Sequence, residues 1–255
     1  MKIGICCDEP GHIPLVPAVG GDFAELHFGN TARQSEEDYA RVGEALAKTG
    51  LQAEAMNCFI PGDFKLCTLE SYGPLELFIR QGMARARALG TQIVVFGSSG
   101  ARRLPEGWTK AEGWQKIAPF ARLAGEIAAE YGVTIAIEPL KYGECTTVNT
   151  LREGLEFLQL AGHPNFRLLA DAYHMAENGE DFADILAAGE SLRHCHIAKP
   201  GDRGFPRPDD GFDYSPFFAA LRRIGYQGRL SIEADDPIDL DRIRASVAYI
   251  KKLTA

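Results

Sequence analysis

The sequence predicts one α/β domain over residues 1–255, folded as a single (β/α)8 TIM barrel. Eight short β-rich, apolar runs recur along the chain, and each is followed by a segment with helical periodicity. Strands that alternate with helices form a parallel sheet, and eight such units in 255 residues fit a closed barrel better than an open sheet. No Gly-x-Gly-x-x-Gly follows the first strand and no linker-like run divides the chain, which argues against a dinucleotide-binding sheet and a second domain.

The expected strands are short and separated by helical segments. They lie at residues 3–7, 23–27, 52–57, 92–96, 134–138, 167–171, 192–197 and 230–233. The clearest helix, at 114–131, carries apolar residues at helical spacing and is followed by Gly132 as a stop. A later helix is expected to have Ser215 as its cap, Pro216 at its first position and Gly225 at its end.

The charge balance is acidic, with 27 Lys and Arg residues against 35 Asp and Glu residues. Because nucleic acids and anionic membranes are bound through Lys and Arg, neither partner is expected. No run approaches the ~18 apolar residues of a membrane span, and the apolar N-terminal run is too short for a signal peptide, so we expect a cytoplasmic protein. The six cysteines lack Cys-x-x-Cys spacing, which indicates reduced thiols.

Four successive strand ends carry residue types that bind metal ions. In a barrel of this kind the active site lies where the strands end, and side chains alternate between its inside and outside. At four of these ends a carboxylate or an imidazole points inward, and the residues are Glu138, Asp171, His196 and Glu233.

A cation explains such a cluster, because two carboxylates about 4 Å apart repel by roughly 4 kcal/mol at an effective dielectric of 20. Three carboxylates and one imidazole form a mainly hard, oxygen-rich site. This donor set suits Mn²⁺, Mg²⁺ or Co²⁺, and Zn²⁺ also accepts these ligand types. We therefore expect one divalent metal ion as the cofactor.

Four segments around these residues carry a shared pattern: Ile135-Ala136-Ile137-Glu138-Pro139-Leu140, Asp171-Ala172-Tyr173-His174-Met175, His194-Cys195-His196-Ile197-Ala198 and Ser231-Ile232-Glu233-Ala234. They resemble the xylose-isomerase-like TIM-barrel superfamily of sugar isomerases and epimerases. Within it the pattern is most similar to the ketose 3-epimerases of the tagatose and psicose type. The resemblance is specific over residues 133–234 and looser before residue 90.

The resemblance implies that the four strand-end residues hold one divalent ion, usually Mn²⁺, and that Glu138 and Glu233 also form an acid–base pair. Such an ion polarises the carbonyl of a ketose and acidifies the hydrogen on the neighbouring carbon. Because the two glutamates come from well-separated strands, one can take a proton from a flat enediolate and the other can return it. We expect a metal-dependent sugar isomerase or epimerase, with C3 epimerisation of a ketose as the leading reaction.

Five further residues are expected to contact the substrate. The resemblance implies that His174 and Glu144 touch substrate oxygens and that Arg203 completes the pocket. Asn57 and Phe59 lie near the end of the third strand, where a sugar needs a hydroxyl partner and an apolar wall.

Other activities on the same scaffold begin with the same proton abstraction, so a dehydratase or a hydroxypyruvate-type isomerase stays open as an alternative. Endonuclease IV, a nuclease of the same superfamily, is a remote alternative. It needs an Asp-x-His in the loop after the metal-binding histidine, and this loop has none. The expected partner is a small-molecule sugar, and self-association into a homo-oligomer stays open.

Two features have more than one interpretation. Glu25 and His27 on the second strand either line the pocket or form a buried hydrogen-bonded pair. The loop Gly97-Ser98-Ser99-Gly100, with Arg102 and Arg103 just after it, either cradles a phosphate or forms a plain tight turn. His194, one layer below His196, is expected to orient or pack and not to bind metal.

Overall fold

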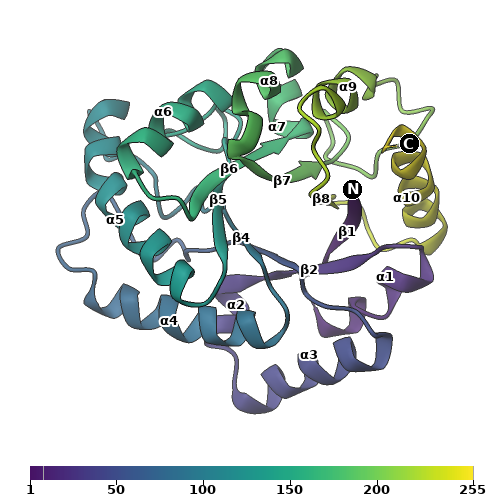
Figure 1. The fold of residues 1–255 in the computed structure, drawn as a ribbon, viewed down its shortest axis with the longest axis horizontal. Helices are drawn as coiled ribbons and strands as arrows, with labels where there is room; N and C mark the ends of the chain where they lie inside the picture. Colours follow the sequence, from purple (N-terminus) through teal and green to yellow (C-terminus); the bar gives the residue numbers. More distant parts are fainter. Residues whose placement is uncertain (8, 255) are drawn as a thin grey trace.

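The computed structural model describes residues 1–7 and 9–254, and in this part of the chain eight parallel strands close into the predicted barrel (Figure 1). The strands are β1 (Lys2–Cys7), β2 (Phe23–His27), β3 (Ala55–Asn57), β4 (Ile93–Phe96), β5 (Thr134–Ile137), β6 (Phe166–Asp171), β7 (Leu192–Ile197) and β8 (Arg229–Ile232). Each strand pairs in parallel with the next along the chain, and β1 also pairs with β8. The closed (β/α)8 barrel that the sequence predicts is therefore confirmed.

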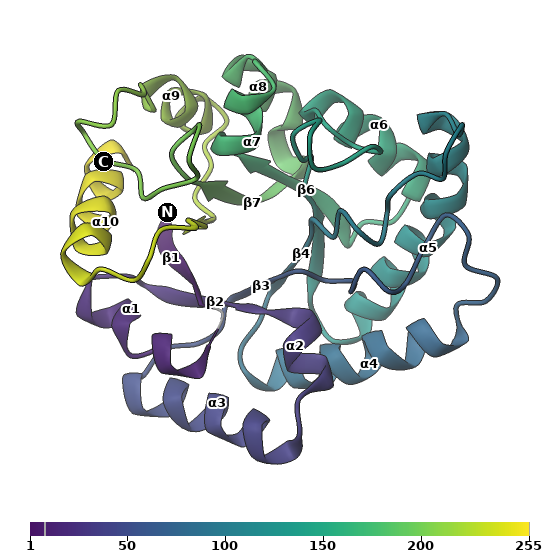
Figure 2. The same ribbon diagram turned by 180° about the vertical axis from the view of Figure 1, so that it is seen from behind.

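Helices surround the barrel, as Figures 1 and 2 show from opposite sides. They are α1 (Leu15–Ala18), α2 (Phe28–Arg33), α3 (Glu36–Thr49), α4 (Gly73–Ala88), α5 (Lys110–Glu130), α6 (Leu151–Ala161), α7 (Ala172–Glu177), α8 (Ile185–Ala188), α9 (Ser215–Arg223) and α10 (Leu240–Thr254). Short 3-10 turns lie at Pro10–His12, Phe182–Asp184 and Gly189–Ser191. Among these helices, which belong to the described residues, none has both the length and the apolar character needed to cross a membrane.

The two helices predicted in detail are present, with different starts. α5 begins at Lys110, four residues before the predicted start at 114, because Thr109 and Glu112 form a capping box there. Ser215 is the first residue of α9 and makes no side-chain cap, so that prediction was wrong. Its N–H instead donates to Asp213 Oδ1 at 2.9 Å, so an aspartate two residues earlier satisfies this end of the helix.

A small apolar cluster fills the inside of the barrel, separate from the larger core between strands and helices. Its members are Phe23, Ala55, Ile93, Val95, Ala136 and Leu169. Ala136 and Leu169 are the residues that alternation places two positions before Glu138 and Asp171. The inward direction predicted for these two carboxylates therefore agrees with the packing beneath them.

Ion pairs join three strands at the amino end of the barrel. Glu54, just before β3, is buried, and it accepts from Lys2 Nζ at 2.5 Å and from Arg229 Nε at 2.6 Å. Lys2 begins β1 and Arg229 begins β8, so these contacts lie across the closure of the barrel. We call this group the amino-end clamp.

The segment between β5 and α6 is fastened to the turn after α7. Asn178 accepts the Tyr142 N–H at 3.0 Å and donates to the Asn149 carbonyl at 2.8 Å. Glu180 Oε1 accepts the Leu151 N–H at 2.7 Å, at the start of α6. Burial raises the pKa of Glu180 to about 7.

This raised pKa predicts how stability depends on pH. In the folded protein Glu180 keeps its proton up to about pH 7, while an unfolded carboxyl loses it near 4.5, so the free energy of unfolding falls between these pH values. Glu180→Gln is expected to remove this contribution and to be about 1–2 kcal/mol more stable than wild type at pH 8, after allowance for solvent screening. Urea unfolding at pH 5, 6, 7 and 8 measures the slope. The exposed Glu190→Gln variant is the control, and equal slopes in wild type and Glu180→Gln would contradict the prediction.

Candidate metal centre and active site

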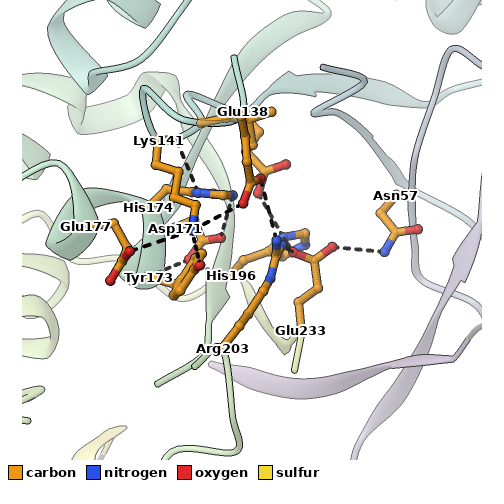
Figure 3. A network of polar contacts seen from close by, with 12 residues as sticks. Asn57, Glu138, Lys141, Asp171, Tyr173, His174, Glu177, His196, Arg203 and Glu233 are labelled. Carbon is orange, nitrogen blue, oxygen red and sulfur yellow. Dashed lines mark hydrogen bonds and ion pairs between the residues drawn. The ribbon is translucent and has the colours of Figure 1, made fainter. Parts of the chain in front are cut away.

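Three carboxylates and one imidazole meet at the carboxyl end of the barrel (Figure 3). Asp171 ends β6 and His196 lies near the end of β7, while Glu138 and Glu233 directly follow β5 and β8. One ligand atom from each residue lies within 4.8 Å of those from the other three. His196 Nδ1 is 3.1 Å from Glu138 Oε1 and 3.5 Å from Glu233 Oε2. The structure thus brings together the four residues that the sequence singles out as metal ligands.

Burial and mutual contact separate the pKa values of these groups. Burial raises the pKa of Asp171 to about 6 and raises the pKa of Glu138 above its ordinary value. Burial also acts on Glu233, but the imidazolium of His196 and the guanidinium of Arg203 outweigh it and lower the pKa to about 2. Burial opposes the protonation of His196, yet the carboxylates around the ring hold its pKa well above the ordinary value.

The donor set fits a divalent cation. Four ligand atoms, three from carboxylates and one from an imidazole, converge closely enough for one ion to contact all of them. A cation at this position would take the place of the proton on the imidazole nitrogen and would offset the repulsion among the carboxylates. These residues therefore form a candidate metal-binding site.

Both carboxylate oxygens of Glu233 are held by neighbouring side chains. Asn57 Nδ2 donates to Oε1 at 3.2 Å, and Arg203 Nη2 donates to Oε2. Arg203 lies in the loop after β7, where its backbone is left-handed with φ of 53°, and its guanidinium carbon is 5.0 Å from the centre of the Tyr173 ring. Asn57 and Arg203 therefore fix the orientation of Glu233, as Figure 3 shows.

His174 and Glu144 flank the metal cluster. His174 Nδ1 accepts the Lys141 N–H at 3.2 Å, and Nε2 lies 3.6 Å from Asp171 Oδ2. Among the described residues this buried Nε2 has no hydrogen-bond partner, and His174 does not line the cavity beside the cluster. The Glu144 carboxylate lies 3.7 Å from Arg203 Nη1 and 3.5 Å from Lys141 Nζ.

A cavity of about 290 Å³ opens beside the cluster. This volume lies near the lower end of the ~300–1,000 Å³ range of small-molecule sites, so the cavity suits a small ligand. The predicted site residues that line it are Asn57, Glu138, Glu144, Arg203 and Glu233, and His27 lines it as well.

Phe59 does not line this cavity, so its predicted role as an apolar wall was wrong. Its side chain is fully buried in the core, with ring centres 5.1 Å from Phe28 and 5.9 Å from Phe96. β3 ends at Asn57, and Cys58 has a left-handed backbone with φ of 51°. The alternation of side chains along the strand stops at that turn. If it had continued, Phe59 would have pointed into the barrel, as Asn57 does.

Lys141 lies beside the metal cluster and is a residue that sequence reasoning missed. Its ammonium donates to the Tyr173 hydroxyl and lies 3.6 Å from Glu177 Oε2. These contacts join the loop after β5 to α7 on the side of the cluster away from Asn57 (Figure 3). In the sequence, Lys141 is marked only by its position three residues after Glu138. A lysine in a loop is too common to predict a site residue.

The structure decides between the interpretations of Glu25. Its carboxylate is fully buried, with Oε1 2.9 Å from His196 Nε2 and Oε2 2.7 Å from His194 Nε2. Glu25 therefore belongs to a buried hydrogen-bonded group, and His194 orients or packs as expected. His27, on the same strand, does line the cavity, and its Nδ1 accepts the Asn30 N–H at 3.0 Å.

Arg102 does not line the cavity, although the loop Gly97-Ser98-Ser99-Gly100 just before it does. Its guanidinium is fully buried, donating to the carbonyl oxygens of Gly97 at 2.6 Å and Glu138 at 2.5 Å. The loop lines the cavity, but this arginine joins the ends of β4 and β5 instead of facing a phosphate.

A family model described as "Xylose isomerase-like TIM barrel" matches residues 14–253 of the chain. The L-ribulose 3-epimerase of Methylomonas sp. is 38% identical over 120 residues, which cover 46% of this chain and 41% of that protein. The alignment therefore spans less than half of the length of that curated relative.

Solved structures share the whole fold. A crystal structure of D-psicose 3-epimerase in the presence of D-fructose has a TM-score of 0.88 at 18% identity, covering 100% of this chain and 99% of that one. The IOLI protein with a zinc atom has a TM-score of 0.77 at 20% identity, covering 100% of this chain and 98% of that one. The structural likeness concerns the fold, and the family match covers nearly all of the sequence. The chain therefore belongs to the xylose isomerase-like TIM-barrel family.

Proposed function

We propose that this protein is a metal-dependent ketose epimerase that inverts the configuration at C3. The main support is the placement of two glutamates from separate strands, Glu138 and Glu233, in one cluster beside a small cavity. A relative that aligns with 46% of the chain is named an L-ribulose 3-epimerase, and a structure of the same fold is a D-psicose 3-epimerase. We also propose that residues 1–255 act as one unit.

The proposed ion is held by Glu138, Asp171, His196 and Glu233. The three carboxylates favour Mn²⁺, with Mg²⁺ and Co²⁺ as further candidates. Zn²⁺ is a candidate too, since a zinc atom is present in one structure of the same fold. When bound, the ion polarises the carbonyl of the ketose and so acidifies the hydrogen on the neighbouring carbon.

The two glutamates are suited to opposite steps. Glu233, whose two carboxylate oxygens are fixed by Asn57 and Arg203, takes the proton from the substrate carbon. Glu138, which follows a different strand, delivers a proton to the other face of the same carbon. In the reverse reaction the two roles exchange. His174 Nε2 and Arg203 are placed to stabilise negative charge on the substrate oxygens.

The charge of the cavity favours a neutral sugar. Among the described residues that line it, Glu144 is a carboxylate outside the proposed metal ligands, and the guanidinium of Arg203 is paired with Glu233. Glu144 accepts hydrogen bonds from sugar hydroxyls but repels a phosphate. We therefore expect free ketoses to react faster than their phosphate esters.

An isotope-exchange screen tests the proposal. The protein, supplied with Mn²⁺, is incubated in deuterated water with free ketoses, ketose phosphates and small keto acids, and the products are followed by NMR. The expected result is deuterium at C3 of a ketose together with its C3 epimer. Deuterium at C1 of the ketose or C2 of an aldose product would instead indicate an aldose–ketose isomerase, and loss of water would indicate a dehydratase. No exchange in any member of the panel would contradict the proposal.

Gly97 gives a separate prediction about Glu138. A Cβ atom at Gly97 would lie 2.4 Å from Glu138 Oε2, so Gly97→Ala is expected to displace this carboxylate. A shift of about 1 Å in a catalytic group costs roughly 10²-fold in rate, and we expect a loss of that size in C3 exchange. The matched control is Gly62→Ala, at another glycine that lines the cavity, where the nearest atom would be 3.6 Å away. Equal rates in the two variants would contradict the close packing of Glu138 on Gly97.

A further inference from the structure

A buried carboxylate lies beneath the metal cluster and contacts two histidines of one strand. Glu25 on β2 has no exposed surface, and neither has His194 or His196 on β7. Oε1 of Glu25 lies 2.9 Å from His196 Nε2, and Oε2 lies 2.7 Å from His194 Nε2. Neither Glu25 nor His196 lines the cavity, and Glu25 contacts the metal cluster through His196.

Hydrogen-bond chemistry assigns the protons of these two rings. An ionised carboxylate only accepts, so both Nε2 atoms carry the hydrogen that they share with Glu25. His194 Nδ1 is buried and has no partner among the described residues, which fits a neutral ring protonated at Nε2. In His196 the same arrangement leaves Nδ1 as the ligand atom, on the side of Glu138 and Glu233.

We propose that Glu25 is a positioning residue that fixes the tautomer and the ring orientation of His196, so that Nδ1 is presented to the metal ion. This inference rests on the proposed metal site. The contact with His194 occupies the second carboxylate oxygen and so holds the Glu25 side chain in one orientation. A carboxylate bound to the far nitrogen of a metal-binding histidine keeps the near nitrogen unprotonated and increases its basicity.

The alternative for Glu25 is a purely structural role as a buried ion-pair partner, and a matched residue separates the two. Glu54 is also buried, also accepts two hydrogen bonds, and lies in the amino-end clamp away from the cluster. Glu25→Gln and Glu54→Gln each remove one buried carboxylate, in the first case one that contacts His196 and in the second case one that contacts Lys2 and Arg229. If the affinity for Mn²⁺ fell merely because a buried carboxylate was removed, it would fall in both variants.

The test measures Mn²⁺ binding to the full chain, by electron paramagnetic resonance of the free ion, without any substrate. Glu25→Gln is expected to weaken Mn²⁺ binding by about 10–100-fold, because the amide can donate to Nε2 and favour the wrong tautomer. Glu54→Gln is expected to bind Mn²⁺ as wild type does. Unchanged affinity in Glu25→Gln, or equal losses in the two variants, would overturn the proposal. Because no turnover is measured, the outcome is separate from that of the ketose screen.

A spectroscopic readout keeps the proposal testable if Glu25→Gln fails to fold. In wild type with ¹⁵N-labelled histidine and the diamagnetic ion Zn²⁺, His196 is expected to show a protonated Nε2 and a metal-bound Nδ1. A metal-bound Nε2 would overturn the proposal. So would a second ion bound through Cys6, Glu25 and His196, whose ligand atoms also lie within 4.8 Å of one another.

Discussion

Glu233→Gln is expected to reduce hydrogen exchange at C3 of the ketose by at least about 10³-fold. A glutamine cannot accept the substrate proton, while its size still fills the place between Asn57 and Arg203. Exchange into deuterated water, followed by NMR at saturating Mn²⁺, measures the loss directly. Epimer formation is expected to fall in parallel, because the same proton transfer is required for both.

The same substitution also removes a metal ligand, so the metal content of the variant must be measured alongside exchange. Loss of exchange in a variant that still binds one ion supports the acid–base role of Glu233. Full recovery of exchange on addition of excess Mn²⁺ would assign Glu233 to metal binding only. Glu54→Gln, which removes a buried carboxylate at the amino end of the barrel, is the control and is expected to retain exchange.

Removal of the divalent ion is expected to abolish exchange and to lower the melting temperature. Without the ion the carboxylates of Glu138, Asp171 and Glu233 repel each other, and the acidity of the substrate hydrogen is no longer increased. An ion present at about 100 times its dissociation constant stabilises the folded state by about 2.7 kcal/mol, which for a chain of this size corresponds to roughly 5–10 °C. Differential scanning calorimetry before and after a chelator measures the shift.

Readdition of ions one at a time then identifies the cofactor, with Mn²⁺ expected to restore the highest rate. Asp171→Asn is the matched variant, because it lacks one of the ligands. Its melting temperature is expected to respond little to the chelator. Full activity in protein shown to carry no metal would contradict both the metal site and the proposed reaction.

The barrel and its four strand-end residues were predictable because both depend on local sequence. Alternation along a strand fixes which side chains point inward, and the parallel arrangement brings the strand ends to the same end of the barrel. Glu138 and Glu233 fall just outside β5 and β8, yet alternation still holds for that one further residue. Their convergence within 4.8 Å required only the order of the strands.

The remaining features depend on backbone turns or on distant partners. Phe59 could not be placed, because the left-handed turn at Cys58 is not evident from its residue type. The role of Glu25 depends on two histidines about 170 positions later in the chain, with separations of 169 and 171 residues. The same holds for Lys141, whose partner Tyr173 lies 32 residues away in α7.

The amino-end clamp has a consequence for changing what this protein acts on. Glu54, Lys2 and Arg229 join β1, β8 and the start of β3 at the end of the barrel opposite the cavity. The closed sheet is therefore stabilised by residues that lie outside the cavity and need not be mutated to change the substrate. A mutant library confined to the cavity loops, such as the segment around Gly62 and the one around Glu144, would redesign specificity with little loss of the scaffold.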